Sequence, residues 1–398
     1  MSSALAPRLS TLRTEVVADE AGFARLAREW DELLGLSEQR VYFLRYGWNR
    51  LWWQMLRPAG AQLFIITVRD GGHLVGLAPF YLCGRRTVGI PHVRELLFIG
   101  TGIYAQTGEF LDLIARRGEE RRVAEAVAAL LLRSDDWDRL CLNEIPAASL
   151  VLPHLRRALG HSAEVHPLSR AHYITTDGDW KEVLTNLSGA TRKNLLYETR
   201  RLFRSHACQL HCVAAASELE PAFDGLVRLH QARWKTRGEP GSFTIPGFED
   251  FLREAARTSL GEDRLRLWTL DVDGDVAAAL IGFYDNGTVH YLQAGFDPRY
   301  ARLSIGRVML GLCIRDCVDD ERVCVLDFMG GNNAYKNEWT QSARETVTLT
   351  CLRPGMRAMA YQGIRRAARL SKSLLKATLP AAVRMAGLRL LQRRYFYR

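Results

Sequence analysis

No stretch of the sequence is apolar for the roughly 18 residues that crossing a lipid bilayer requires. The N-terminal segment also lacks an apolar core and turns acidic early, so it predicts no secretory signal. The eight cysteines include no Cys-x-x-Cys pair, and most stand inside apolar runs, where a thiol behaves as a small buried hydrophobic group. These absences predict a protein of a reduced, cytoplasmic compartment.

One cluster of metal-binding residue types does occur. The segment HACQLHC contains His206, Cys208, His211 and Cys212, but its spacing matches none of the usual zinc patterns. A strand near Leu210 to Val213 is the simpler interpretation, and we expect no metal.

Acidic residues are missing from the C-terminal part of the chain. Residues 346–398 hold twelve of the 54 Lys and Arg residues and none of the 44 Asp and Glu residues, so the net charge of +10 arises there. Leu and Val recur between these cations at roughly helical spacing, which predicts a basic amphipathic helical tail over 356–398. Such a tail can lie on an anionic membrane at the inner membrane face, contact tRNA phosphates, or dock on the protein body.

The sequence contains two copies of one plan. Residues 63–82 and 265–284 each read as a β-hairpin, with an Asp-Gly turn between two apolar runs. A helical stretch and a short apolar strand follow each hairpin, and SDDWDRLCLNEI at 134–145 parallels VDDERVCVLDFM at 318–329. This predicts a mixed α/β fold with related units over 15–165 and 175–355. Two unrelated segments that share a common arrangement are the alternative.

A loop in the second unit has features of an anion site. It connects a predicted strand over 288–296 to a helix that begins near Ser304, which can cap that helix, and Gly306 leaves the first turn bare. Unpaired backbone N–H groups and the helix dipole favour an anion there, and Arg302 and Arg307 would add charged donors. Many helices begin in this way, so the loop alone does not establish an anion site.

The order of elements in the second unit resembles the GNAT acyltransferase fold. Arg302-Leu-Ser-Ile-Gly306 resembles a degenerate form of that family's Arg/Gln-x-x-Gly-x-Gly/Ala pyrophosphate motif, with Ile305 where the nearest group has Pro. That nearest group is the BioF2-like, CelD-type acetyltransferases, which are similar to the FemAB aminoacyl transferases in pairing two GNAT-like halves. The matching residues are Leu229, His230, Arg233, Trp234, Ser304, Gly306, Asp327, Phe328, Gly330 or Gly331, Tyr335, Lys336 and Trp339.

The resemblance implies tandem GNAT folds in a FemAB-like double domain, with one donor site in the second unit. An acyl-CoA such as acetyl-CoA would be bound by Gln293, Gly295, Arg302, Ser304, Ile305, Gly306 and Arg307. Tyr335 would protonate the leaving thiolate, Lys336 would stabilise an oxyanion or bind a phosphate, and Asp327 would act as base or amine anchor. Taken one at a time, Asp327 is as well explained by the capping of a loop, Tyr335 by packing in the core, and Lys336 by a solvated surface position.

The acceptor is expected to bind between the two units. His230, Arg233 and Trp234 share one face of a predicted helix and would line its pocket, unless Trp234 only anchors that helix. Arg192 and Lys193 belong to a basic helix that could hold phosphate or sugar acid groups, or could be a solvated face. Glu109 and Asp112 of the first unit would shape the cleft.

These features predict an N-acyltransferase that moves an acyl group from acyl-CoA to an amine. The resemblance alone adds that the amine belongs to a sugar or to an envelope or exopolysaccharide precursor. One alternative is a FemAB-like transferase that uses aminoacyl-tRNA, and another is a non-catalytic accessory protein of exopolysaccharide synthesis.

Overall fold

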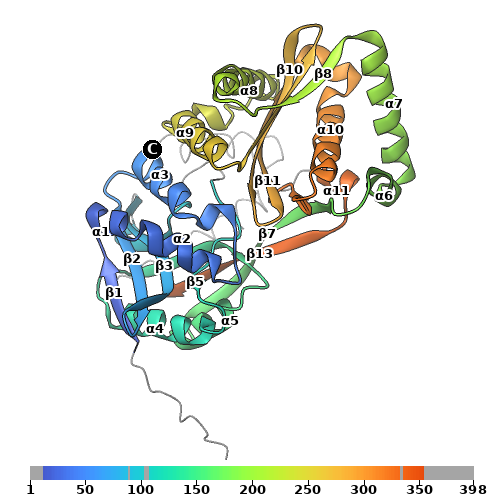
Figure 1. The fold of residues 1–398 in the computed structure, drawn as a ribbon. Helices are drawn as coiled ribbons and strands as arrows, with labels where there is room; N and C mark the ends of the chain where they lie inside the picture. The colour runs from blue at the N-terminus through green and yellow to red at the C-terminus, as the bar shows by residue number, and fades with distance from the viewer. Residues whose placement is uncertain (1–11, 88–89, 103–106, 332–334, 354–398) are drawn as a thin grey trace, which may run out of the picture.

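The computed structural model describes residues 12–87, 90–102, 107–331 and 335–353, so the tail predicted over 356–398 lies outside the described residues. The described strands form one sheet that extends through two lobes (Figure 1). The first lobe contains β1 to β6, the second contains β8 to β12, and β7 and β13 lie between them. The strands are β1 (Arg13–Val17), β2 (Gln62–Asp70), β3 (His73–Thr87), β4 (Ile90–Phe98), β5 (Ile114–Ala115), β6 (Arg139–Pro146), β7 (Ala163–Thr175), β8 (Cys208–Cys212), β9 (Leu265–Val272), β10 (Asp275–Asp285), β11 (Thr288–Phe296), β12 (Val325–Asp327) and β13 (Ala343–Leu352).

Helices cover both faces of this sheet. The α-helices are α1 (Glu20–Arg25), α2 (Ala27–Gly35), α3 (Tyr46–Leu56), α4 (Glu120–Arg133), α5 (Leu152–Leu159), α6 (Trp180–Asn186), α7 (Gly189–Ser205), α8 (Ala216–Thr236), α9 (Phe248–Gly261), α10 (Ile305–Asp319) and α11 (Lys336–Trp339). Short 3-10 turns occupy η1 (Tyr42–Leu44), η2 (Ser242–Thr244) and η3 (Pro298–Leu303). Within the described residues, no helix combines the length and the apolar character needed to cross a membrane.

The order of the strands is symmetric about the centre of the sheet. It runs β1-β2-β3-β4-β6-β13-β7-β12-β11-β10-β9-β8, so that each strand on one side of the centre has a counterpart on the other. The hairpin β2–β3 corresponds to β9–β10, and the parallel pair β4–β6 corresponds to the parallel pair β11–β12. The mixed α/β fold expected from the repeated plan is confirmed.

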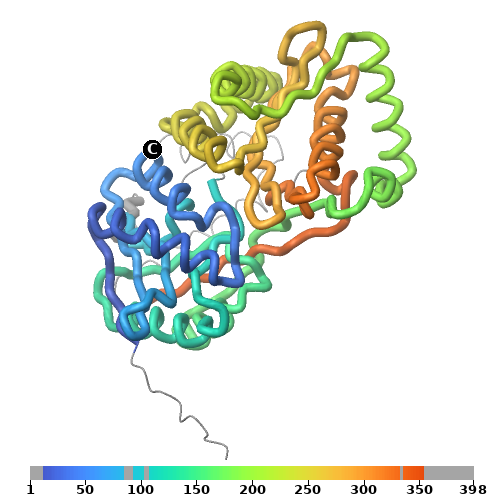
Figure 2. The backbone as a smooth tube through the Cα atoms, in the orientation of Figure 1, coloured from blue at the N-terminus to red at the C-terminus, as the bar shows by residue number. Residues whose placement is uncertain are grey.

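The two central strands are exchanged between the lobes. β7 follows β6 in the chain but pairs with β12, whereas β13 follows β12 but pairs with β6. β7 and β13 also pair with each other, from His172–Ala343 to Ala163–Cys351, and Figure 2 shows β13 running from the second lobe into the first. The expected boundary near 165–175 falls inside β7, and the division into separate domains stays a prediction.

Local sequence accounts for the turns and the helix starts. Gly71 and Gly72 in one hairpin, and Asp273 and Gly274 in the other, have positive φ, as two-residue hairpin turns require. The helix α7 starts at Gly189, because the Ser188 hydroxyl accepts a hydrogen bond from the Thr191 N–H and caps the helix there.

One apolar core joins the two lobes. α8 and α9 cover one face of the second lobe's sheet, and α7 and α10 cover the other (Figure 1). On the α9 side, Tyr42 of the first lobe stacks on Phe283 with ring centroids 4.7 Å apart, and Trp48 meets Phe251 at the same distance. The lobes therefore cannot separate without exposing large aromatic side chains.

We expect Leu349→Ala to destabilise the first lobe, although Leu349 lies near the end of the second half of the sequence. Its side chain is fully buried in the core that includes Leu142, its partner on β6, so truncation leaves a cavity. The free energy of unfolding in urea should fall by about 2–5 kcal/mol. The exposed Glu345→Ala on the same strand is the control. Equal stability of the two variants would show that β13 contributes little to this core.

Candidate active site

The second lobe's sheet opens between β11 and β12. These strands pair in parallel only from Thr288–Val325 to His290–Asp327, after which β12 ends and β11 continues to Phe296. Gln293 and Gly295 lie on the stretch of β11 that β12 leaves uncovered, and both pair with β10 on the other edge. Gly295 is required by packing, because a Cβ there would lie 2.1 Å from the His230 backbone nitrogen of α8.

A group of buried and half-buried charges, the junction cluster, lies where β12 meets the first lobe. It consists of Glu109, Glu144, Asp327, Lys336 and Arg344. The Asp327 side chain is fully buried, accepts a hydrogen bond from the Met329 N–H (2.7 Å) and pairs with Arg344 (3.0 Å). The Lys336 ammonium donates to the carbonyls of Met329 (2.7 Å) and Gly330 (2.6 Å).

The first lobe supplies two carboxylates to the cluster. Glu109 is fully buried and accepts a hydrogen bond from the backbone N–H of Gly330. Glu144, at the end of β6, accepts from the Thr346 hydroxyl of β13 (3.1 Å). The exchange of β13 therefore brings Arg344 to Asp327 and Thr346 to Glu144 on a single strand.

Burial shifts the pKa values of the three carboxylates and of Lys336 towards neutrality. It raises the pKa of Glu109 well above the usual value, and the charges of Asp327 and Glu144 raise it further. Burial also raises the pKa of Asp327 to about 6, with Arg344 and Lys336 opposing, and the pKa of Glu144 to about 6. The pKa of Lys336 is lowered by burial, while the carboxylates oppose the change. Asp327 and Glu144 can therefore gain and lose protons near neutral pH, whereas Glu109 favours its protonated form.

The backbone around the cluster is strained. Phe110, Glu144 and Met329 have φ values of 57°, 63° and 57°, in the left-handed region that costs a non-glycine residue about 1–2 kcal/mol. The Leu111 N–H donates to the Glu144 carbonyl (2.9 Å), and Lys336 holds the Met329 carbonyl. Strain retained at three neighbouring positions is typical of functional sites.

Tyr335 extends from the cluster towards the opening in the sheet. It precedes Lys336, and its hydroxyl hydrogen-bonds with that of Tyr291. Burial raises the pKa of Tyr335, and the nearby Arg233 opposes the change. Tyr335 therefore keeps its proton at neutral pH.

His230 and Arg233 border the same opening. His230 is fully buried, which lowers its pKa to about 4, with Gln293 opposing. Among the described residues, neither its ring nitrogens nor the Arg233 Nε has a partner in hydrogen-bonding geometry. The Arg233 guanidinium lies 4.9 Å from the centre of the Phe296 ring. Buried polar atoms of this kind indicate a place where a polar ligand or water binds.

The predicted donor loop differs from expectation. Ser304 has a left-handed backbone (φ 55°), and its hydroxyl does not cap α10 but donates to the Glu198 carboxylate of α7 (2.9 Å). Arg307 pairs with Glu198 (3.0 Å) and with Glu338 (2.9 Å). Ser304 therefore occupies the N-cap position of α10 as expected, but its hydroxyl makes no capping hydrogen bond because Glu198 takes it, and the charge of Arg307 is already compensated.

The other loop residues have structural surroundings. A Cβ on Gly306 would lie 3.1 Å from the Phe296 ring, so the first turn of α10 is covered by that ring. Ile305 is fully buried in the core of the second lobe, and Arg302 is exposed.

Four further predicted residues lie outside the junction cluster. Asp112 is buried elsewhere, where it accepts from the Leu113 N–H (2.8 Å) and the Ser149 hydroxyl, and burial raises its pKa to about 7. Trp234 lies against Arg237, whose guanidinium is 5.6 Å from its ring. Arg192 and Lys193 lie on α7, at the outer edge of the second lobe (Figure 1).

Two cluster residues were missed from the sequence. Glu144 could have been found, because the repeat that aligns Cys141 with Cys324 also aligns Glu144 with Asp327. Arg344 carries no such signal, since only the pairing of β13 brings it to Asp327.

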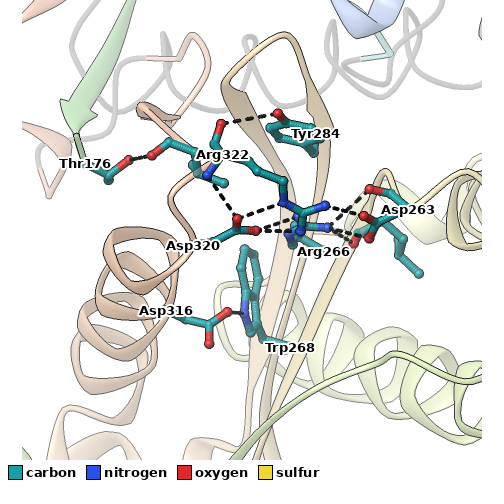
Figure 3. A network of polar contacts seen from close by, with 10 residues as sticks. Thr176, Asp263, Arg266, Trp268, Tyr284, Asp316, Asp320 and Arg322 are labelled. Carbon is teal, nitrogen blue, oxygen red and sulfur yellow. Dashed lines mark hydrogen bonds and ion pairs between the residues drawn. The ribbon is translucent and has the colours of Figure 1, made fainter.

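A cavity of about 360 Å³ lies away from the cluster, beside β8, β9 and α10. Arg266 pairs there with Asp320 (2.9 Å), Arg322 pairs with Asp320 and Asp263, and the Trp268 indole donates to Asp316 (2.7 Å; Figure 3). These charged groups pair with one another, so we interpret the network as one that stabilises the fold. In HACQLHC, β8 forms as expected, and His206 and His211 pair with Asp273 and Glu218 respectively.

Comparison with known proteins places this geometry in a fold class. Residues 189–337 match the model of the acetyltransferase (GNAT) domain. FemX is similar in structure, with a TM-score of 0.57 at 9% identity over 85% of this chain and 98% of that chain. The C-terminal domain (DUF2156) of a putative lysylphosphatidylglycerol synthetase from Agrobacterium fabrum has a TM-score of 0.52 at 11% identity, over 87% of this chain and 97% of that chain.

A third structure, L-PGS from Bacillus licheniformis, has a TM-score of 0.52 at 10% identity, over 85% of this chain and 96% of that chain. No curated protein sequence matches the chain. The chain thus has a GNAT domain within a FemX-like double fold, which supports an acyltransferase and implies an acyl-CoA co-substrate.

We expect Glu144→Gln to stabilise the protein at high pH only. Because folding raises the pKa of Glu144 from 4.5 to about 6, the folded state binds this proton more tightly, and stability falls as pH rises through that window. Removing the charge should make the variant's advantage about 2 kcal/mol larger at pH 8 than at pH 4. Urea unfolding at both pH values measures this, with the exposed Glu321→Gln as control. The same difference at both pH values would contradict it.

Proposed function

We propose that the chain is an N-acyltransferase whose acceptor amine binds at the junction cluster and whose acyl donor lies in the opening between β11 and β12. The observation that carries this proposal is the position of Asp327, a buried carboxylate of raised pKa at the point where the two strands part. A catalytic base is most effective when its pKa lies near the working pH.

In this proposal Asp327 accepts the proton that the acceptor ammonium must lose. Arg344 and Lys336 keep part of its population ionised at neutral pH despite complete burial. Lys336 acts as a positioning residue, because both its hydrogen bonds go to the carbonyls of the loop that follows Asp327. Glu109, on the first lobe, orients the amine from the opposite side.

The donor side consists of Tyr335, Tyr291, His230, Arg233 and Gln293. An acyl-CoA would supply the activated acyl group, and the unsatisfied polar atoms of His230 and Arg233 fit its polar chain. Tyr335 holds the proton that a leaving thiolate needs. The diphosphate fits the start of α10 less well, because Glu198 occupies the donors of Ser304 and Arg307.

The finer substrate class follows from the resemblance to the BioF2-like, CelD-type group. We propose an amino sugar of an envelope or exopolysaccharide precursor as the acceptor. The half-buried ring of Tyr173, whose centre lies 4.5 Å from the Arg344 guanidinium, is an aromatic surface near the cluster that suits a sugar.

A FemAB-like transferase that uses aminoacyl-tRNA is the second candidate. Glu198 favours it, because a carboxylate at the start of α10 disfavours a free diphosphate. FemX is similar to this chain across both halves of the double fold.

We expect Asp327→Asn to reduce kcat by about 10²–10⁴-fold, because it removes the base. Free-thiol release from acetyl-CoA with hexosamine acceptors measures the rate. The wild-type rate should fall below pH 6, where Asp327 becomes protonated, and the variant should lose that pH dependence. The exposed Asp319→Asn is the matched control. A folded Asp327→Asn variant with the wild-type rate and acid limb would refute the assignment.

We expect Glu198→Gln to bind acetyl-CoA about tenfold more tightly than the wild type, because it removes a negative charge beside the start of α10, where the diphosphate would bind. Isothermal titration calorimetry measures the affinity, with the exposed Glu182→Gln as control. An unchanged or weaker affinity would place the diphosphate elsewhere. Absence of binding by all three proteins would favour the aminoacyl-tRNA donor.

A further inference from the structure

α7 has one face that the body of the protein leaves uncovered. Its buried side, formed by Thr191, Leu195 and Leu202, packs towards α10. The opposite side carries Lys193, Tyr197, Arg200, Arg201 and Arg204, which recur at intervals of three and four residues and are all exposed. The 17-residue helix is about 25 Å long and lies at the outer edge of the molecule (Figure 1).

The charge of this face is of one sign. Glu198 is the single acidic residue in 189–205, and it points towards α10, where it pairs with Arg307. The chain outside residues 346–398 is nearly neutral, so these cations are a local concentration and not a sample of a basic surface. A face of this kind complements a polyanion.

Apolar side chains accompany the cations. Tyr197 is 61% exposed and stands among them, and Phe203, 43% exposed, lies along one edge of the stripe. Exposed aromatic rings beside Lys and Arg are typical of helices that lie in the headgroup region of a bilayer, with rings at the acyl boundary. The exposed side of a single helix is convex, so it offers no groove to enclose a nucleic acid strand, whereas a flat lipid surface can meet its whole length.

We propose that the exposed face of α7, defined by Lys193, Tyr197, Arg200, Arg201, Phe203 and Arg204, docks the protein on an anionic lipid surface. The cations contact lipid phosphates, and the two aromatic rings enter the interface. The segment 346–398, with twelve cations and no acidic residue, has the same preference by composition. Docking through α7 would hold the start of α10, which Glu198 contacts, close to the membrane plane.

Vesicle sedimentation of the full-length chain tests the proposal. Wild-type protein should bind vesicles that contain phosphatidylglycerol at physiological salt and should not bind vesicles of phosphatidylcholine alone. Arg200→Glu/Arg204→Glu should weaken binding at least about 30-fold, since each cation near the surface contributes about 1 kcal/mol. Arg156→Glu/Arg157→Glu, at two exposed positions of α5, makes the same change in net charge and should bind as the wild type does.

A second variant tests the apolar contact with the lipid and leaves the charges of the helix unchanged. Phe203→Ser should weaken binding at high salt as well, because it removes an apolar contact that salt does not screen. If Arg200→Glu/Arg204→Glu binds the vesicles as tightly as the α5 variant, the proposal is wrong and another segment binds the lipid. If the wild type ignores the vesicles but retards tRNA in a gel, and the α7 variant loses that shift, the face binds nucleic acid and the lipid proposal is overturned.

Discussion

The burial of Asp327 and Glu109, beside the half-buried Glu144, is the constraint on which the rest of the structure depends. Asp327 is fully buried and can ionise only because Arg344 and Lys336 lie beside it. Those cations belong to different segments, so the loop after β12, the position of α11 and the register of β13 must all be correct together. The strained residues at the cluster remain in place for the same reason, since the surrounding hydrogen bonds leave them no alternative.

The exchange of β7 and β13 makes that arrangement possible. A GNAT domain that kept its own last strand would have only its own residues around Asp327. Here β13 crosses to β6 and presents Arg344 to one repeat's carboxylate and Thr346 to the other's. In the proposed site the two lobes play unlike parts: the second has the opening between β11 and β12, and the first contributes Glu109 and Glu144.

Local patterns predicted much of the fold. Both hairpins, the strand over 288–296 and the helix after Ser304 follow from turn residues and periodicity, and the mixed α/β class follows from their order. Asp327 was identified by its motif, and Glu109 was assigned to the first lobe's side of the cleft. The contacts of the loop could not be predicted in the same way: Glu198 reaches Ser304 across 106 positions of sequence, and no local signal encodes that pairing. Arg344 likewise acquires its partner only through β13.

The late position of β13 in the chain affects how the protein is made. The strand β6 leaves the ribosome roughly 200 residues before the strand that covers its edge, a delay of roughly 10–40 seconds at ordinary rates of synthesis. During that interval, the first lobe presents an apolar strand edge, the kind of surface that pairs with other chains. The sheet of the first lobe is therefore completed only after β13 has been synthesised, and until then its open edge is a surface that chaperones can cover.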